Sequence, residues 1–332
     1  MKWYEARGKE ADVVVSTRIR LARNIRNCPF PWRMSLSQKR EALAFFRQSL
    51  QEIFPGMHFL GLEERSDVEV ISLVERHLLH PEIVSERAGC GLLVTEDESV
   101  SILLGGEDHI RIQVLCAGFH LQEAYAVAEQ MDELPEKSLP VAFDDRYGYL
   151  TQRPGDLGTG MKASLLMHLP AMQESNAIRR VADNLHKIGF TVRGVYGDWS
   201  DPKGALYQVS NQVTLGLSER AALENLQGIA TQILQRERGL WKEMAENESY
   251  QDRIWRSCGV LRSARILNND EFMKLISNVR FGISAGMMDN ITLETINRLM
   301  IEAQPATLME RGKTDMAGQE KLRAEVVREA LR

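Results

Sequence analysis

A run of arginines near the N-terminus has the composition and spacing of a phosphate-binding strand. Residues 12–22 begin with β-branched residues and continue with arginines that alternate with aliphatic side chains, a pattern that predicts a strand. The period-2 spacing of a strand places Arg18 and Arg20 on one face, and Arg23 follows shortly after. Planar, permanently charged guanidinium groups suit phosphate oxygens. Spacing alone also allows a solvated basic edge strand, so both interpretations stay open.

A second group of reactive side chains lies between two apolar strand patterns. The segment Gly-Gly-Glu-Asp-His-Ile-Arg at 105–111 brings an acid, an imidazole and an arginine together. The ends of strands hold catalytic groups rigidly, which makes Glu107 and Arg111 candidates for chemistry. The alternative is a turn with ordinary polar residues. The lone His109 has poor spacing for a metal-ligand set, so no metal site is predicted here.

A glycine-rich segment at 153–162 ends in a lysine, which at first suggests a phosphate-binding loop. Gly155 and Gly160 have the spacing of the two glycines in G-x-x-x-x-G-K-[ST]. Met161, however, stands where that motif needs its lysine. We therefore reject that interpretation.

Hydrophobic periodicity predicts the elements that must hold these groups. Strands are predicted at 68–74, 190–196 and 205–209, and a meander at 91–114 with breaks at 96–98 and 105–106. Helices are predicted at 121–133 and 177–188. After Ser218 the period becomes helical through residue 245, and helical segments continue from Ile254 with breaks near 268–270, 286 and 305. The prediction is an α+β fold, with a mostly antiparallel sheet flanked by helices in residues 1–245 and a small all-helical C-terminal domain in residues 246–332.

Composition limits the class of protein and its surroundings. A chain of 332 residues can form one large domain and a smaller one, and 44% apolar with 26% charged residues is typical of globular proteins. We expect no membrane helix, no secretory signal and a cytoplasmic location. A net charge of −5 argues against a direct nucleic-acid partner. The four widely spaced cysteines are expected to be reduced, structural thiols.

Four segments together carry a resemblance to a known family. They are Ser-Thr-Arg-Ile-Arg-Leu-Ala-Arg-Asn from Ser16, Glu-Asp-His-Ile-Arg from Glu107, Asp-Leu-Gly-Thr-Gly-Met from Asp156, and Val-Arg-Gly-Val-Tyr-Gly from Val192. In order and approximate spacing they resemble the guanidino (phosphagen) kinase family. The resemblance is closest to its bacterial protein-arginine kinases, because the first motif begins at residue 16 and leaves no room for the helical N-terminal domain of creatine and arginine kinases. The implied fold is a guanidino-kinase-like antiparallel sheet followed by a helical domain.

The resemblance also implies roles for individual residues. ATP would be the nucleotide, and the residues expected to bind it are Ser16, Arg18, Arg20, His77, Arg111, Lys162 and Arg193. Mg²⁺ would bridge the phosphates of ATP, and no side chain is assigned as a metal ligand. Glu107 would be the catalytic carboxylate that pairs with the substrate guanidinium and can accept its proton. Asp198 is the best match for a second acid that completes the cradle.

The glycine-rich segment and the C-terminal tail depart from the family pattern. Arg153 stands where the family has a reactive cysteine, and Asp156 where it has an asparagine. An arginine in that place would repel a substrate guanidinium unless it points away or is paired, and an ion pair with Asp156 is one hypothesis. In the tail, Gln319 and Glu320 stand nearest to the family's arginine–aspartate pair that recognises phosphoarginine, and that site is not carried over.

The function implied by the resemblance is transfer of the ATP γ-phosphate to arginine side chains of proteins, which marks them for proteolysis in stress response and quality control. Expected partners are protein substrates, an activator protein and an ATP-dependent protease or chaperone. An amphipathic pattern at Leu322, Val326, Val327 and Leu331 predicts a dimerisation helix and hence a homodimer. Two alternatives remain: a catalytically degenerate family member that binds nucleotide or protein as a regulator, and a small-molecule guanidino kinase.

Overall fold

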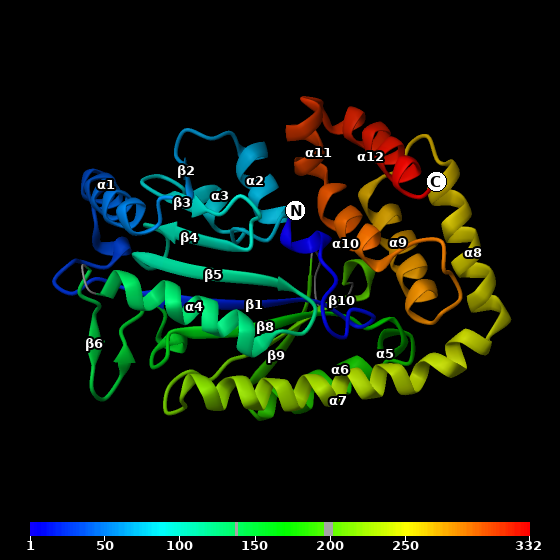
Figure 1. Cartoon of the computed structure of the whole chain (residues 1–332), viewed down its shortest axis with the longest axis horizontal. Helices are drawn as coiled ribbons and strands as arrows, with labels where there is room; N and C mark the ends of the chain where they lie inside the picture. Colours follow the sequence, from blue (N-terminus) through cyan, green and yellow to red (C-terminus); the bar gives the residue numbers. More distant parts are fainter. Residues whose placement is uncertain (137–138, 196–201) are drawn as a thin grey trace.

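A broad antiparallel sheet is the centre of the computed structural model (Figure 1), which describes residues 1–136, 139–195 and 202–332. Within these residues, eight strands pair in the order β2-β3-β4-β5-β1-β8-β10-β9. Their bounds are β1 Val14–Arg23, β2 His58–Gly61, β3 Gly91–Val94, β4 Val100–Leu104, β5 Ile110–Ala117, β8 Met161–His168, β9 Phe190–Gly194 and β10 Leu206–Asn211. A short hairpin of β6 (Phe143–Asp144) and β7 (Gly148–Tyr149) stands apart from this sheet.

Helices cover one face of the sheet and leave the other face polar at its centre. The covering helices are α1 (Leu36–Ile53), α4 (Leu121–Glu136), α6 (Ala177–Lys187) and α7 (Glu219–Glu246). They bury alternate strand residues such as Ile19 and Leu21, both at most 1% exposed, in one large core. Because side chains alternate along a strand, Arg18 and Arg20 must point to the opposite face.

The C-terminal helices form a second core at one end of the sheet (Figure 1). They are α8 (Glu248–Ser263), α9 (Asn269–Ser284), α10 (Leu293–Glu302), α11 (Pro305–Gly312) and α12 (Met316–Ala330). Val15 and Leu206 of the sheet belong to this second core. The short helix α5 (Pro170–Glu174) packs against α7 and contributes Ala171 to this second core.

A third, smaller core lies beside β3 and β4 and includes α2 (Asp67–Glu75) and α3 (Ile83–Glu86). Helix α2 is bound to α11 through the half-buried side chain of Glu75. Its carboxylate accepts hydrogen bonds from the main-chain nitrogens of Ala306 (3.0 Å) and Thr307 (2.7 Å) and from the Thr307 hydroxyl (2.9 Å). These donors belong to the first turn of α11, whose amides have no partner within the helix. The C-terminal helices are thereby tied to the segment that leads into the polar face.

The predicted fold class is confirmed, with two local corrections. The strand predicted at 68–74 is wrong, because these residues form α2: Ser66 and Glu69 make a capping box that starts a helix despite the β-branched composition. The apolar residues expected to form a dimerisation face lie instead inside the chain, where Val327 and Leu331 are at most 1% exposed in the second core. No helix among the described residues is both long enough and apolar enough to cross a membrane.

Candidate phosphate-binding and acceptor site

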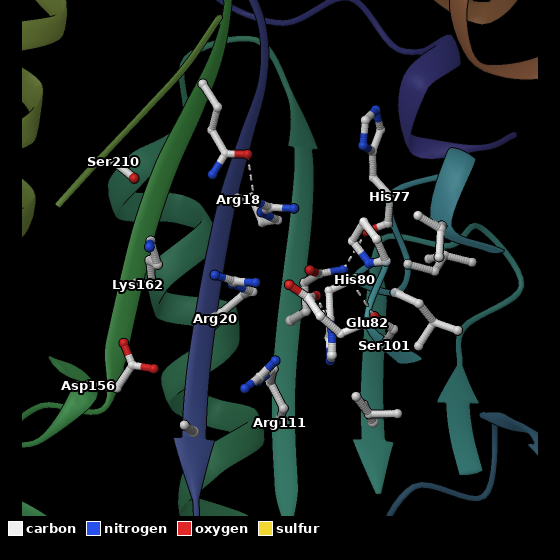
Figure 2. Close-up of a pocket in the computed structure, with 18 of the residues that line it drawn as sticks. Arg18, Arg20, His77, His80, Glu82, Ser101, Arg111, Asp156, Lys162 and Ser210 are labelled. Carbon is white, nitrogen blue, oxygen red and sulfur yellow. Dashed lines mark hydrogen bonds and ion pairs between the residues drawn. The ribbon is translucent and has the colours of Figure 1, made fainter. Parts of the chain in front are cut away.

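A cavity of about 370 Å³ lies on the polar face of the sheet, and cationic side chains line much of it (Figure 2). Its arginines and lysine are Arg18, Arg20, Arg111, Arg153, Lys162 and Arg193. The acids that line it are Glu82 and Asp156. This excess of positive charge makes the cavity suited to a polyanion such as a nucleotide's phosphates.

Strand register explains why these cations meet although they are distant in sequence. Arg20 on β1 lies opposite Gln113 on β5 and Lys162 on β8, so Arg20 and Lys162 are direct neighbours (Figure 2). Arg111 is two residues before Gln113 and therefore shares its face. Arg193 on β9 lies opposite Gln208 on β10. The four pairings β5–β1, β1–β8, β8–β10 and β10–β9 thus collect the cations on one surface.

Arg18 is held in place by polar neighbours on the adjacent strands. Its Nη2 donates a hydrogen bond of 2.8 Å to Oε1 of Gln208, and its Nε donates one of 3.3 Å to the hydroxyl of Ser164. Gln208 was not among the residues predicted for the site. The alternation of β10, which places Gln208 and Ser210 on one face, is the signal that could have found it.

Burial and mutual repulsion both lower the pKa values of positively charged side chains in the cavity. Burial, followed by the charges of Arg18 and Arg111, lowers the pKa of Arg20. Burial, followed by the charge of Arg20, lowers the pKa of Lys162 to about 8. Asp156 acts in the opposite direction on both groups. A bound anion would relieve this repulsion, which is the behaviour expected of a phosphate site.

Histidines at the end of α2 form another wall of the cavity. His77 has a left-handed main chain with φ of 65°, and its carbonyl oxygen accepts a 2.9 Å hydrogen bond from Nε2 of Gln113. Burial, with a further contribution from Arg18, lowers the pKa of His77 to about 3, so its ring is neutral near pH 7. Ser16, Arg18 and His77 also line a small adjoining cavity. His80, which sequence analysis did not predict, lines the main one.

Glu107 lies beside this cavity, and both of its carboxylate oxygens are engaged. Oε2 accepts a 2.8 Å hydrogen bond from Nη2 of Arg111. Oε1 is paired with Nε of Arg153. The hypothesis that Arg153 pairs with Asp156 is therefore wrong. Arg111 and Arg153 both line the cavity, so the two ion-pair partners of Glu107 lie at the cavity wall.

Asp108, next to Glu107, fixes the segment that carries Arg153. Its Oδ1 accepts hydrogen bonds from Nδ2 of Asn24 (2.7 Å) and from the main-chain nitrogen of Gln152 (2.9 Å). This buried carboxylate joins the end of β1, the start of β5 and the residue before Arg153. His109 is turned away from the cavity, because its Nδ1 accepts a 2.9 Å hydrogen bond from the main chain of Ile25.

The glycines of 153–162 serve close packing. Gly158 has φ of +101°, and a side chain there would lie 2.3 Å from the carbonyl oxygen of Thr214. Gly160 has φ of +60°, and a side chain there would lie 2.7 Å from the carbonyl oxygen of Ala22 on β1. Both positions therefore require glycine for backbone reasons. Lys162 belongs to strand β8 and not to the loop, which agrees with the rejection of a phosphate-binding loop.

The remaining predicted residues lie away from this cavity or outside the described structure. Arg23 points to the helix-covered face, where its Nη2 is 2.6 Å from Oδ2 of Asp132 on α4. Gln319 is buried on α12 and accepts a hydrogen bond from the buried Arg323, which gives it a structural role. Asp198 lies outside the described residues.

Metal-ligating side chains do not cluster in the part of the chain that the structure describes. Among the described residues, no group of three or more histidines, cysteines or acids is placed to hold a metal ion. The main cavity is lined mostly by the positively charged side chains of arginines and a lysine, and such groups do not coordinate metal cations.

Comparisons with known proteins agree with this geometry. Residues 40–240 match the family model "ATP:guanido phosphotransferase, C-terminal catalytic domain", and residues 247–332 match "Protein-arginine kinase McsB C-terminal domain". A taurocyamine kinase from Schistosoma mansoni, solved with bound transition state analog components, has a TM-score of 0.61 and 26% identity over 71% of this chain and 34% of that duplicated chain. A lombricine kinase with a TM-score of 0.59 and 21% identity, over 70% of this chain and 68% of that chain, shares the fold. The chain belongs to the ATP:guanido phosphotransferase family.

Full-length relatives narrow this class further. The protein-arginine kinase of Brevibacillus brevis is 40% identical over 99% of this chain and 95% of its own length. The protein-arginine kinase of Clostridium acetobutylicum is 36% identical over 99% of both chains. Within the family, the chain therefore groups with the protein-arginine kinases, as the resemblance in sequence predicted.

Proposed function

We propose that this chain transfers the γ-phosphate of ATP to arginine side chains of proteins. The observation that carries the proposal is the meeting of two features at one place. A cavity lined by the cations of neighbouring strands can hold nucleotide phosphates, and the carboxylate of Glu107 lies beside it, where it can bind an acceptor guanidinium. Phosphoryl transfer from ATP to arginine needs both features side by side.

In this proposal Arg18, Arg20, Arg111, Lys162 and Arg193 hold the phosphates of ATP. The transition state of phosphoryl transfer spreads negative charge over the equatorial oxygens, so cations fixed before the reaction supply most of the stabilisation. Hydrogen bonds from Arg18 to neighbouring strands support such preorganisation. Bound Mg²⁺ would supply further charge neutralisation through the phosphates. Ser16 and the neutral His77 would lie toward the nucleoside.

Glu107 would bind the acceptor guanidinium and orient one of its nitrogens toward the cavity. A guanidinium is protonated at any ordinary pH and is a poor nucleophile in that form. A carboxylate within hydrogen-bonding distance can accept the proton as the new nitrogen–phosphorus bond forms. Asp198 is proposed as the second acid of this cradle by resemblance alone.

The proposal extends to the setting of the enzyme. We propose a catalytic domain at 1–245 and a helical domain at 246–332, in agreement with the two matched segments. We also propose a cytoplasmic homodimer that acts with an activator protein and an ATP-dependent protease or chaperone in the stress response. Since the apolar face of α12 is occupied within the chain, a homodimer would use another surface.

The direct test is incubation of the chain with ATP, Mg²⁺ and an unfolded protein, followed by mass spectrometry under conditions that preserve acid-labile phosphoarginine. We expect phosphoarginine on the protein substrate. Glu107→Gln keeps the size of the side chain but removes the base, and should lower the rate by about 10²-fold or more. Arg220→Ala is the matched control, because Arg220 forms an exposed pair with Glu224 outside the cavity.

One specific observation favours a second function. Glu107 is already paired with Arg153, which is the arrangement that a degenerate member binding nucleotide without transfer would show. ATP binding without phosphoarginine on any acceptor would establish this second function. Transfer to free arginine but not to protein would instead identify a small-molecule guanidino kinase.

A further inference from the structure

Arg153 presents to Glu107 the same chemical group that an acceptor would present. Its guanidinium nitrogen Nε pairs with Oε1 of Glu107, while Arg111 holds the second oxygen at 2.8 Å. Glu107 is 12% exposed, so an incoming guanidinium has little of this carboxylate left to bind. Arg153 also lines the cavity proposed for the phosphates. An arginine of the chain itself therefore occupies the place proposed for the acceptor.

The main chain of Arg153 is held by hydrogen bonds, whereas its side chain is largely exposed to solvent. Its carbonyl oxygen accepts hydrogen bonds from the Thr151 hydroxyl (2.8 Å) and the main-chain nitrogen of Asp156 (3.0 Å). The preceding residue, Gln152, is bound to the buried Asp108. The side chain of Arg153, in contrast, is 59% exposed. Rotation about side-chain bonds alone would withdraw the guanidinium without disturbing the loop.

We propose that Arg153 is an internal competitor for the acceptor site, which every substrate guanidinium must displace from Glu107. The inference rests on the proposed function, because it takes Glu107 as the acceptor carboxylate. It gives the arginine at this position a role that acts on the acceptor and not on ATP. No covalent step is involved, since the exchange replaces one guanidinium–carboxylate pair by another.

The expected size of the effect follows from the contact of the pair with solvent. Glu107 is 12% exposed but its partner Arg153 is 59% exposed, so solvent screens the pair and it favours its formed state by a factor of roughly two to five. The acceptor site would then be open about one third to one sixth of the time, and the apparent affinity for any acceptor would be reduced by roughly three- to sixfold. Competition of this kind applies equally to free arginine and to a protein-borne arginine.

The test compares acceptor binding in the wild-type chain and in Arg153→Ala. Free L-arginine is titrated into the full chain by NMR, which reports binding without turnover. We expect Arg153→Ala to tighten arginine binding about three- to sixfold and to lower the KM for an unfolded protein substrate by the same factor. The KM for ATP should change less than the KM for the acceptor. Arg153→Gln, which keeps most of the side-chain length, should act in the same direction.

The same substitution in chains that carry Glu107→Gln separates competition for Glu107 from a general effect of removing the positive charge of Arg153. In chains that carry Glu107→Gln, the change from Arg153 to Ala should no longer tighten arginine binding, because the pair that competes has already been weakened. The control Arg220→Ala should leave arginine binding unchanged. Equal or weaker arginine binding in Arg153→Ala, or a gain that persists with Glu107→Gln, would overturn the inference. If the wild-type chain phosphorylates no protein, the proposed function fails, while the NMR titration still decides the role of Arg153.

Discussion

Nucleotide binding should weaken at alkaline pH, and Lys162 should be responsible. Burial and the charge of Arg20 lower the pKa of Lys162 to about 8 in the free protein. A phosphate bound beside Lys162 favours the protonated amine and raises its pKa toward the ordinary value for lysine. Binding at alkaline pH must therefore first restore a proton to Lys162.

The sign and size of the effect follow from this linkage. Well below pH 8 the lysine of the free protein is charged, so its contribution to binding is fully present and the affinity is nearly constant. Above pH 8 the free protein loses the proton while the complex keeps it, so the affinity falls by up to tenfold per pH unit. At pH 9 about a tenth of the free protein would carry the charge, and the dissociation constant for the nucleotide should be about tenfold higher than at pH 7.

Isothermal titration calorimetry with ADP from pH 7 to 9.5 would measure this profile. Lys162→Arg should flatten it, because the guanidinium stays charged throughout this range. Lys187→Arg replaces an exposed lysine outside the cavity and should leave the profile unchanged. A wild-type affinity that stays constant up to pH 9, or a decline of equal size in Lys162→Arg, would refute the assignment to Lys162.

Three further substitutions test the support of the site. Gln208→Ala removes the acceptor that orients Arg18 and should weaken nucleotide binding a few-fold in the same titration, by about 1 kcal/mol, the typical net contribution of one hydrogen bond. Gly160→Ala would place a methyl group 2.7 Å from a carbonyl oxygen of β1, so urea denaturation should show a loss of about 1–3 kcal/mol in the free energy of unfolding. Glu75→Ala leaves the first amides of α11 without their acceptor and should cost about 1–3 kcal/mol, whereas Glu64→Ala at an exposed position should have little effect.

The parts of the site that follow strand periodicity could be predicted from the sequence. The alternation of residues 16–21 was enough to place Arg18 and Arg20 on one face, and the structure has them there. Their meeting with Arg193 could not be read from the spacing, because it depends on strand order and not on neighbours in sequence. The family resemblance supplied that connection.

Contacts between distant loops were beyond local sequence patterns. The pairing of Arg153 with Glu107 arises because Asp108 binds the main chain of Gln152 and so brings two loops together. The helix at α2 was missed for a different reason. Its β-branched residues favour a strand locally, but the capping box at Ser66 and the core around α2 determine the outcome.

The hydrogen bonds between Glu75 of α2 and the first turn of α11 also determine where the chain can be truncated. The two matched family segments meet near residue 247, which invites expression of the first segment alone. Such a truncation would remove the amides that Glu75 binds and would expose the apolar surfaces of Val15 and Leu206 that the second core covers. Because Glu75 lies two residues before His77, this loss would reach the wall of the main cavity. The segments are separable in sequence but depend on each other for stability.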